Sequence, residues 1–452
     1  MTFEEFEKIS SKQWKQKIQF ELDGSDFSSS LIWKSIEGID VRPFYHNDLD
    51  AKSVSVHHNA QNWKIGHAIY VQNEKAANKK ATTWLKNGAE CLYFVLPHSN
   101  LSLSDLLLDI DSENTPFYFE PRFLDDVIIS KFERFYSKKN RSIFVLNDPI
   151  GQLGRHGNWH HSMTKDFELM DQTFKTLNGF KSVISVDTTL YQNAGASMVQ
   201  QLAFGLAHAN EYLNRFSEIS SKTMTFKFAV GSNYFFEIAK LQAFRLLWQS
   251  LMKNHQMNIG CHIISTPSTR NKTVYDFNTN LLRTTTETMS AAIGSSDVII
   301  NRPYDDLYRK TNDFSERLAL NQLLILKHES YFSSVKNPAE GAYYIENLTK
   351  QLATKALLLF KKIEKEGGFL KQLKSGTVQQ QLRAHAQSEQ DRYDSKQLGL
   401  VGVHIQPNGE EKMKPQVELY PFLKKRIRKT LIQPIIEKRI AASEEKQRLD
   451  DE

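Results

Sequence analysis

The chain is short of cysteine and of long apolar runs. Only two cysteines, Cys91 and Cys261, occur in 452 residues, and each lies in or beside an apolar, strand-like run. We therefore expect buried thiols rather than a disulfide or a metal-binding pair, as in a reducing compartment. No apolar run approaches the ~20 residues of a membrane helix, and the N-terminal sequence lacks the apolar core of a signal peptide. The sequence predicts a cytoplasmic protein with no membrane contact.

A strong excess of one charge is also missing. The 58 basic and 52 acidic residues leave a formal net charge of +6, which is too small and too dispersed to indicate nucleic acid. The one local excess is the segment 424–439, with seven Lys or Arg against a single acid, Glu437. This segment could bind phosphate or nucleic acid. Because few aromatic residues interleave it, a solvated face or a contact with an acidic partner subunit is the simpler interpretation.

Common phosphate and nucleophile motifs are absent. No P-loop or Ser-based nucleophile elbow occurs, and no Gly-rich phosphate turn follows the first predicted strand. The run GQLGRHG at 151–157 follows the fourth predicted strand but lacks the right glycine spacing, and we interpret it as a plain loop. These absences disfavour an open dinucleotide-binding sheet.

Apolar strand-like runs alternating with amphipathic helical patterns are what the chain does contain. Eight such strands over about 240 residues match the size of a (β/α)8 TIM barrel. We expect a barrel at 51–375, an N-terminal helical and extended arm at 1–50 that contacts another subunit, and a C-terminal helical extension at 376–452 with a basic helical tail. The predicted strands are 67–71, 91–95, 117–119, 142–146, 182–186, 225–230, 261–264 and 297–301, and the clearest helices are 202–213, 237–252, 280–293, 314–328 and 344–366.

The ends of these strands are where a barrel carries its chemistry. The positions to inspect are Asp187, Gly231, Ser265 and Asn301 or Arg302. The loop after Asp187 supplies hydroxyls and an amide but no second acid and no His for proton transfer. We therefore expect a hydrogen-bonded loop there rather than a working acid.

Three further candidates have structural explanations. His262 is flanked by Cys261 and Ile263, which favours a satisfied core histidine over a metal ligand. Three histidines share one loop and could hold a metal, but no carboxylate or Cys accompanies them, so a surface or interface loop is favoured; they are His156, His160 and His161. Glu237 and Glu287 fall in helical patterns, where charged faces and helix-start roles are the default.

Several segments together resemble one family, the cobalamin-dependent methylmalonyl-CoA mutases. The similarity runs from about Trp14 to about Ile405, and the resemblance also implies a barrel. The segments are LIWKSIEGIDVRPFY (31–45), YQNAGASMVQQLAFGLAHANEYL (191–213), FKFAVGSNYFFEIAKLQAFRLLW (226–248), NLLRTTTETMSAAIGSSDVIINRPYD (280–305) and 325–368.

Departures from the catalytic pattern point to one branch of that family. Catalytic chains carry a flavodoxin-like domain whose Asp-x-His-x-x-Gly motif binds cobalt, and no Asp-x-His occurs here. Their Gly-Tyr-His-Met-Gln-Glu-Ala-Gly-Ala run corresponds to 188–196, where Leu190 replaces the His that assists the rearrangement. Their His-Ser-Gln-Thr-Ser-Gly run corresponds to 264–269, which reads ISTPST. The chain is similar to the small (β) subunit of the bacterial heterodimeric enzyme, with the cobalamin-binding domain missing.

The resemblance implies a barrel with no catalytic, cofactor-binding or metal residues of its own. It implies a large (α) subunit as heterodimer partner, which carries adenosylcobalamin, binds the acyl-CoA and interconverts methylmalonyl-CoA and succinyl-CoA. Two alternatives stay open. The barrel could bind acyl-CoA itself and work with a separate cobalamin-domain protein, or it could be a purely stabilising subunit with no pocket.

Overall fold

The protein is seen here in a computed structural model that describes residues 9–48, 60–111, 114–136, 142–216, 219, 223–424 and 428–452. Phe3 and Phe6 of the predicted arm, the predicted boundary at residue 51, and two basic residues of segment 424–439, Lys425 and Arg426, lie outside these ranges.

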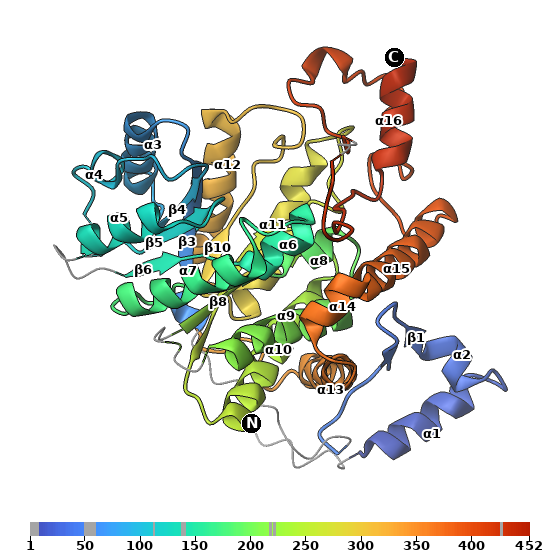
Figure 1. Ribbon diagram of the computed structural model, residues 1–452. Helices are drawn as coiled ribbons and strands as arrows, with labels where there is room; N and C mark the ends of the chain where they lie inside the picture. Colours follow the sequence, from blue (N-terminus) through green and yellow to red (C-terminus); the bar gives the residue numbers. More distant parts are fainter. Residues whose placement is uncertain are drawn as a thin grey trace.

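An eight-stranded parallel sheet forms the centre of the molecule, with helices around it (Figure 1). Its strand order is β6-β5-β4-β3-β10-β9-β8-β7. The two ends of this order meet, because Phe144 of β6 forms a parallel bridge with Ser182, which precedes β7, and the Val145 amide donates to the Ser182 carbonyl at 2.8 Å. The predicted (β/α)8 barrel is confirmed.

All eight predicted strands are present. Three of them differ from the prediction by three residues at one end: β3 begins earlier, β7 begins later and β9 ends later than predicted. The strands are β3 (Lys64–Tyr70), β4 (Cys91–Leu96), β5 (Phe117–Pro121), β6 (Ile143–Val145), β7 (Ser185–Asp187), β8 (Thr223–Val230), β9 (Gly260–Pro267) and β10 (Val298–Ile300).

The helices that follow the strands also match the predicted pattern, with one exception. The run 151–157, interpreted as a loop, lies in helix α6, which Asp148 caps through the Gly151 amide and Pro149 begins. The barrel helices are α3 (Glu74–Lys86), α4 (Leu103–Leu106), α5 (Asp126–Tyr136), α6 (Pro149–His156), α7 (Met163–Thr176), α8 (Thr189–Asn193), α9 (Met198–Arg215), α10 (Tyr234–His255), α11 (Thr279–Ile293), α12 (Asp313–Leu324) and α13 (Tyr343–Lys365).

Side chains fill the inside of the barrel. The inner cluster is mostly aromatic and β-branched, so the barrel is a packed core rather than a pore; its members are Cys91, Tyr93, Tyr118, Phe144, Leu146, Ile264, Val298 and Ile300. Cys91 is a buried free thiol, as predicted, and Cys261 is a free thiol that is only partly buried.

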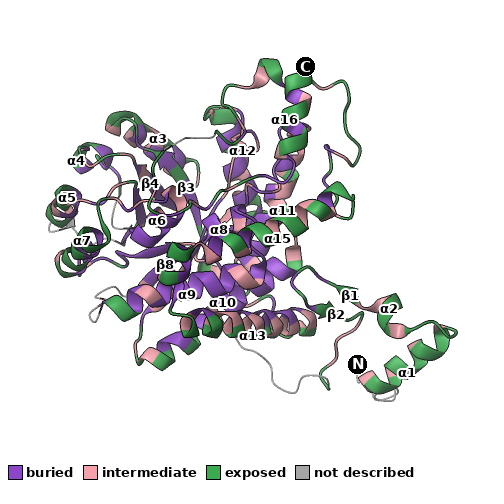
Figure 2. Ribbon diagram, turned by 45° about the vertical axis from the view of Figure 1, so that its right-hand side comes forward, coloured by how far each residue is buried: buried purple, intermediate pink, exposed green. Residues whose placement is uncertain are grey.

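Helix α9 has 13 of its 18 residues buried. It packs against α10 and α13, and Figure 2 shows most of it as buried. Gly205 lets α9 lie close to Thr188, the residue before α8, because an added methyl group would lie 2.8 Å from Thr188 Cγ2. The helix predicted at 202–213 is confirmed.

The N-terminal arm projects from the barrel (Figures 1 and 2). Helices α1 (Ser11–Glu21) and α2 (Phe27–Leu31) bury none of their residues, and a hairpin of β1 (Trp33–Lys34) and β2 (Asp40–Val41) follows. The hairpin turn is docked, because the buried Glu37 carboxylate accepts the Met198 and Val199 amides at the start of α9, at 2.9 and 3.1 Å. The hairpin is attached further through Ile39 and Val41, which belong to the main apolar core, and Tyr45 packs on Tyr344 of α13, whereas the two helices of the arm face solvent.

The C-terminal extension returns to the barrel. After α14 (Phe369–Ser375) and α15 (Thr377–Asp394), the chain passes α8 and α6 before ending in α16 (Ala442–Asp451) (Figure 1). We call residues 428–441 the strap. The predicted helical tail begins only at Ala442. The backbone of the described part of the basic segment is bonded to the barrel, but four of its five described basic side chains are exposed, as the solvated-face interpretation expects, and only Arg439 is buried.

No helix among the described residues is long and apolar enough to cross a membrane.

Candidate functional site at the barrel mouth

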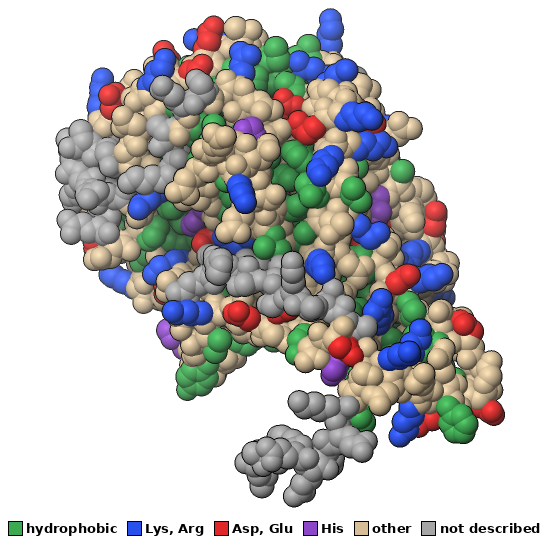
Figure 3. Space-filling model, turned by 90° about the horizontal axis from the view of Figure 1, so that it is seen from below, with side chains coloured by type: hydrophobic (Ala, Val, Ile, Leu, Met, Phe, Trp, Pro, Cys, Tyr) green, Lys and Arg blue, Asp and Glu red, His purple; other side chains and the backbone are tan. Residues whose placement is uncertain are grey.

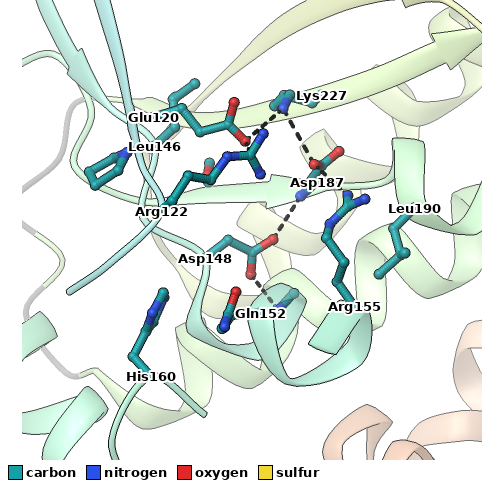
Figure 4. A pocket seen from close by; sticks show the side chains of 13 residues that line it. Glu120, Arg122, Leu146, Asp148, Gln152, Arg155, His160, Asp187, Leu190 and Lys227 are labelled. Atoms are coloured by element: carbon teal, nitrogen blue, oxygen red, sulfur yellow. Dashed lines mark hydrogen bonds and ion pairs between the residues drawn. The ribbon is translucent and has the colours of Figure 1, made fainter. Parts of the chain in front are cut away.

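A cavity of about 360 Å³ lies at the carboxyl ends of the strands, the end we call the mouth. Its lining is polar on most sides and contains charges of both signs. Residues that line it include Glu120, Arg122, Arg155, Asp187, Asn193, Lys227, Thr266, Thr269, Arg302 and Glu437. Figure 4 shows an adjoining recess of about 50 Å³ that shares several of these side chains.

Lys227 joins two carboxylates in the mouth. Its Nζ lies 3.1 Å from Glu120 Oε1 and 3.3 Å from Asp187 Oδ2 (Figure 4). Tyr93 donates to the other Glu120 oxygen at 2.6 Å, and Thr189 donates to Asp187 Oδ1 through both its amide and its hydroxyl. Each carboxylate therefore has several partners.

Arg155 extends this network toward the strap. One terminal nitrogen lies 3.0 Å from Asp187 Oδ2, and the other is paired with Glu437 of the strap. Asn193 Nδ2 donates to the second Glu437 oxygen at 3.0 Å. Helices α6 and α8 thus supply the donors, and the strap supplies the acceptor.

Opposite charges hold these buried groups in their ionised forms. Burial is the largest single influence and raises the pKa of Glu120 and Asp187, but the nearby cations together outweigh it and lower both pKa values; they are Lys227 with Arg122 for Glu120, and Lys227 with Arg155 for Asp187. Burial likewise lowers the pKa of Lys227, and the same two carboxylates reverse this and raise it. The mouth is a set of mutually neutralised ions rather than a poised acid or base.

A second network lies behind Asp187. The Asp148 carboxylate accepts the Asp187 amide at 2.9 Å and the Tyr212 hydroxyl at 2.7 Å, and it lies 2.9 Å from His208 Nε2. Tyr191 in turn bonds to His208 Nδ1 at 2.8 Å. The imidazole of His208 is fully buried and held on both nitrogens, which makes it a structural group.

Leu190, the residue that the resemblance places in correspondence with a catalytic His, is 1% exposed. A methyl group added to Gly154 would contact both Leu190 and Ile435, so these two side chains flank the same helix glycine. Leu190 is therefore part of the apolar core below the strap, and its side chain offers no hydrogen-bond donor to the mouth (Figure 4).

The predicted strand-end residues are only partly brought together. Asp187 and Arg302 line the cavity. Ser265 is buried inside the longer β9 and bonds to Ser296 at 2.7 Å, so its placement at a strand end was wrong. Asn301 donates to Ala319 and Gln322 of α12, away from the cavity. Gly231 donates its amide to Glu237 at 2.9 Å.

The histidines have structural partners. His262 stacks on Phe144 and bonds to the Tyr118 hydroxyl at 3.0 Å inside the barrel, which confirms the core interpretation. In the 156–161 loop, His161 Nε2 bonds to the Leu124 carbonyl, whereas His160 lines the recess, where burial lowers its pKa to about 4. No group of three or more candidate metal ligands gathers anywhere in the described ranges.

Both helical glutamates are 1% exposed, and each is paired with a buried lysine. Glu237 has the predicted helix-start role, since it lies in the first turn of α10 and accepts the Gly231 amide, and it also lies 2.5 Å from Lys240 Nζ. Glu287 is not on a charged face: it is 1% exposed and paired with the buried Lys272 at 2.7 Å. Such a pair stays inside only because each ion neutralises the other.

Most of the charged residues that line the mouth were not predicted from the sequence. Glu120 and Arg122 follow directly on the predicted end of β5, and Lys227 interrupts an apolar strand between Phe226 and Phe228. A lone lysine in a buried strand is a signal that could have been used. Glu437 could not be found this way, because its partners lie more than 200 residues away.

Comparisons with known proteins give a consistent result. The methylmalonyl-CoA mutase family model matches residues 127–450. The chain is 33% identical to the methylmalonyl-CoA mutase small subunit of Porphyromonas gingivalis, over 90% of this chain and 71% of that protein. It is 25% identical to the small subunit of Streptomyces virginiae, over 88% of this chain and 70% of that one. It is also 30% identical to the large subunit of P. gingivalis, over only 52% of this chain and 34% of the relative.

The matched region begins in α5 and includes the strand-loop-helix unit of Asp187 and the strap. Relatives of similar extent are named small subunits, whereas the large-subunit match covers about half of the chain. The chain belongs to the methylmalonyl-CoA mutase family.

Proposed function

We propose that this chain is the small subunit of a methylmalonyl-CoA mutase and that it carries no catalytic residue of its own. A large subunit pairs with it in the cytoplasm and performs the interconversion of methylmalonyl-CoA and succinyl-CoA. The names of its relatives support this role. The observation that carries the proposal is the mouth itself, whose charges are paired with one another and whose rim is crossed by the strap.

The residues at the mouth do not fit a cobalamin. A pocket for a drug-sized ligand already measures ~300–1,000 Å³, and a corrin ring with its axial groups is much larger than such a ligand. The cavity of about 360 Å³ is lined by ion pairs, and Glu437 of the strap lies at its edge. We therefore assign adenosylcobalamin, which supplies the radical chemistry, to the partner subunit.

The chain also lacks a donor for the substrate thioester at the position that the resemblance assigns to it. Polarising a thioester carbonyl needs a hydrogen-bond donor at the oxygen, and Leu190 has none. A barrel in this state still provides a surface for its partner, as a pseudo-symmetric dimer requires.

The arm supports a partner role. Its helices bury no residue, yet Ile9, Phe20 and Trp33 are 63%, 87% and 50% exposed. Apolar side chains on a projecting segment are typical of a protein–protein contact. At the lower right of Figure 3, a small hydrophobic group is exposed among side chains of both charges.

The proposal is tested by assaying the purified chain alone, the large subunit alone and the two together, each with adenosylcobalamin. We expect no turnover from the isolated chain and full activity only with the large subunit. Isomerisation by the isolated chain would contradict the proposal.

A second candidate is favoured by one observation, the polar cavity that remains at the strand ends. In that case the chain binds acyl-CoA and works with a separate cobalamin-domain protein. Calorimetric titration of the chain with methylmalonyl-CoA distinguishes the two, because tight binding supports the second candidate and its absence supports the first. A purely stabilising subunit would likewise bind no CoA ester.

A further inference from the structure

The strap is held to the mouth by its backbone. The Leu431 and Ile432 amides donate to the Gly157 carbonyl at 3.0 and 3.2 Å, and the Ile435 amide donates to Gly154 at 2.8 Å. Further on, the Lys438 and Ile440 amides donate to the carbonyls of Asn193 and Arg270, at 3.1 and 2.9 Å. Such bonds on both sides of residue 437 set where its side chain points.

Buried side chains reinforce this attachment. Ile432 and Ile435 are 8% and 5% exposed and belong to the main apolar core. On the other side of Glu437, Arg439 is 6% exposed, pairs with Glu445 and donates to the Lys272 carbonyl. The strap is therefore an integral part of the fold, and it presents one carboxylate to the mouth.

The two side chains that contact the Glu437 carboxylate both donate hydrogen bonds to it. Arg155 takes one Glu437 oxygen, and Asn193 Nδ2 takes the other at 3.0 Å. Asp187 holds the second terminal nitrogen of Arg155 at 3.0 Å, so the guanidinium keeps its orientation whether or not Glu437 is present. A fixed guanidinium beside an amide is a preorganised receptor for one carboxylate.

We propose that Arg155 and Asn193 form a carboxylate-binding site in the mouth and that the chain fills this site with its own Glu437. The site takes a small carboxylic acid, bound as the anion, and the cavity of about 360 Å³ next to it has room for the rest of such a molecule. Because the argument uses only this chain's side chains, it is independent of the proposed function and of whether the barrel is catalytic.

The test removes the Glu437 carboxylate from the site and adds a free carboxylate to the solution. In the full-length Glu437→Ala variant, sodium acetate or propionate should raise the thermal midpoint in a saturable way, by about 1–2 °C at ten times Kd for a chain of this size. Sodium chloride at equal ionic strength should not do so. The wild type should show no carboxylate-specific shift, because Glu437 already occupies the donors.

Two further variants make the result specific. Glu410→Ala removes an exposed carboxylate and should behave as the wild type. The double variant Arg155→Met/Glu437→Ala should lose the response to acetate, while Lys227 still neutralises Asp187. The proposal is overturned if Glu437→Ala shows no carboxylate-specific shift, or if the wild type or the double variant shifts equally.

If Glu437→Ala does not fold in chloride buffer, its refolding yield replaces the thermal midpoint as the readout. Recovery of folded protein in acetate supports the site, and equal failure in acetate and chloride overturns it.

Discussion

Lys227 is the single residue on which the charge balance of the mouth depends most. Its ammonium lies between Glu120 and Asp187, whose side chains are only 10% and 13% exposed. In Lys227→Met, two neighbouring buried carboxylates lose their shared cation, and breaking such a pair costs ~3–5 kcal/mol of unfolding free energy. Urea denaturation at pH 7 measures this loss. Lys79→Met, at an exposed position on α3, should change stability by no more than ~0.5 kcal/mol.

The stability of the Lys227→Met variant should also depend on pH in a characteristic way. In the wild type, the pKa values of Glu120 and Asp187 are lowered, so their stabilisation is present above the unfolded value near pH 4 and is lost only as pH falls through the folded pKa. Without Lys227, burial is less opposed and the pKa of at least one carboxyl rises above its unfolded value. The variant then loses stability as pH rises through that value. The difference between wild type and variant should therefore shrink from pH 7 to pH 4, and a constant difference would contradict this account.

The elements themselves were more predictable than their ends. Runs such as 91–95 and 117–119 are apolar because parallel barrel strands are buried on both faces, and the structure has them as strands. The predicted ends of strands were wrong where polar residues continue a strand. The 260–267 strand ends in Ser, Thr and Pro, so Ser265 was placed at the mouth although it bonds to Ser296. The position of the strap was not predicted for another reason, because its contacts are to residues distant in sequence.

The join between the strap and helix α6 tests one of these long-range contacts. Gly157 ends α6 at φ +75°, and a methyl group added there would lie 2.7 Å from the Ile432 carbonyl oxygen. Gly157→Ala should cost ~1–2 kcal/mol for the left-handed backbone and should also displace the strap. Gly376→Ala is the matched control, because its φ is +84° but nothing lies within 4 Å of the added methyl.

Limited trypsin digestion separates the two effects, since Arg428, Lys429 and Lys438 lie in the strap. Cleavage there should accelerate in Gly157→Ala and stay near the wild-type rate in Gly376→Ala after correction for global stability. Equal acceleration in both variants would mean that the strap is not held at Gly157.

At the scale of the whole molecule, the two ends of the chain differ in how they meet the barrel. The strap is bonded to the mouth through Gly154 and Gly157, whereas the arm touches the body through Glu37 and the hairpin and leaves its helices exposed. The strap therefore lies on the rim of the barrel, whereas the helices of the arm face outward. This asymmetry fits the proposed function, in which the outward-facing arm is available for contact with a large subunit.

Phe20 on α1 is the side chain that tests the outward segment best. It is 87% exposed, and α1 buries none of its residues, so Phe20→Asp should leave the thermal midpoint unchanged. If the arm contacts the large subunit, placing a charge in that interface should weaken association at least ~10-fold. Co-purification with the large subunit and a titration of the two chains measure the effect. Phe314→Asp, on α12 at 66% exposure, is the control that should keep full affinity, because it alters another exposed ring far from the arm. Equal affinity for all three proteins would exclude the arm from the contact.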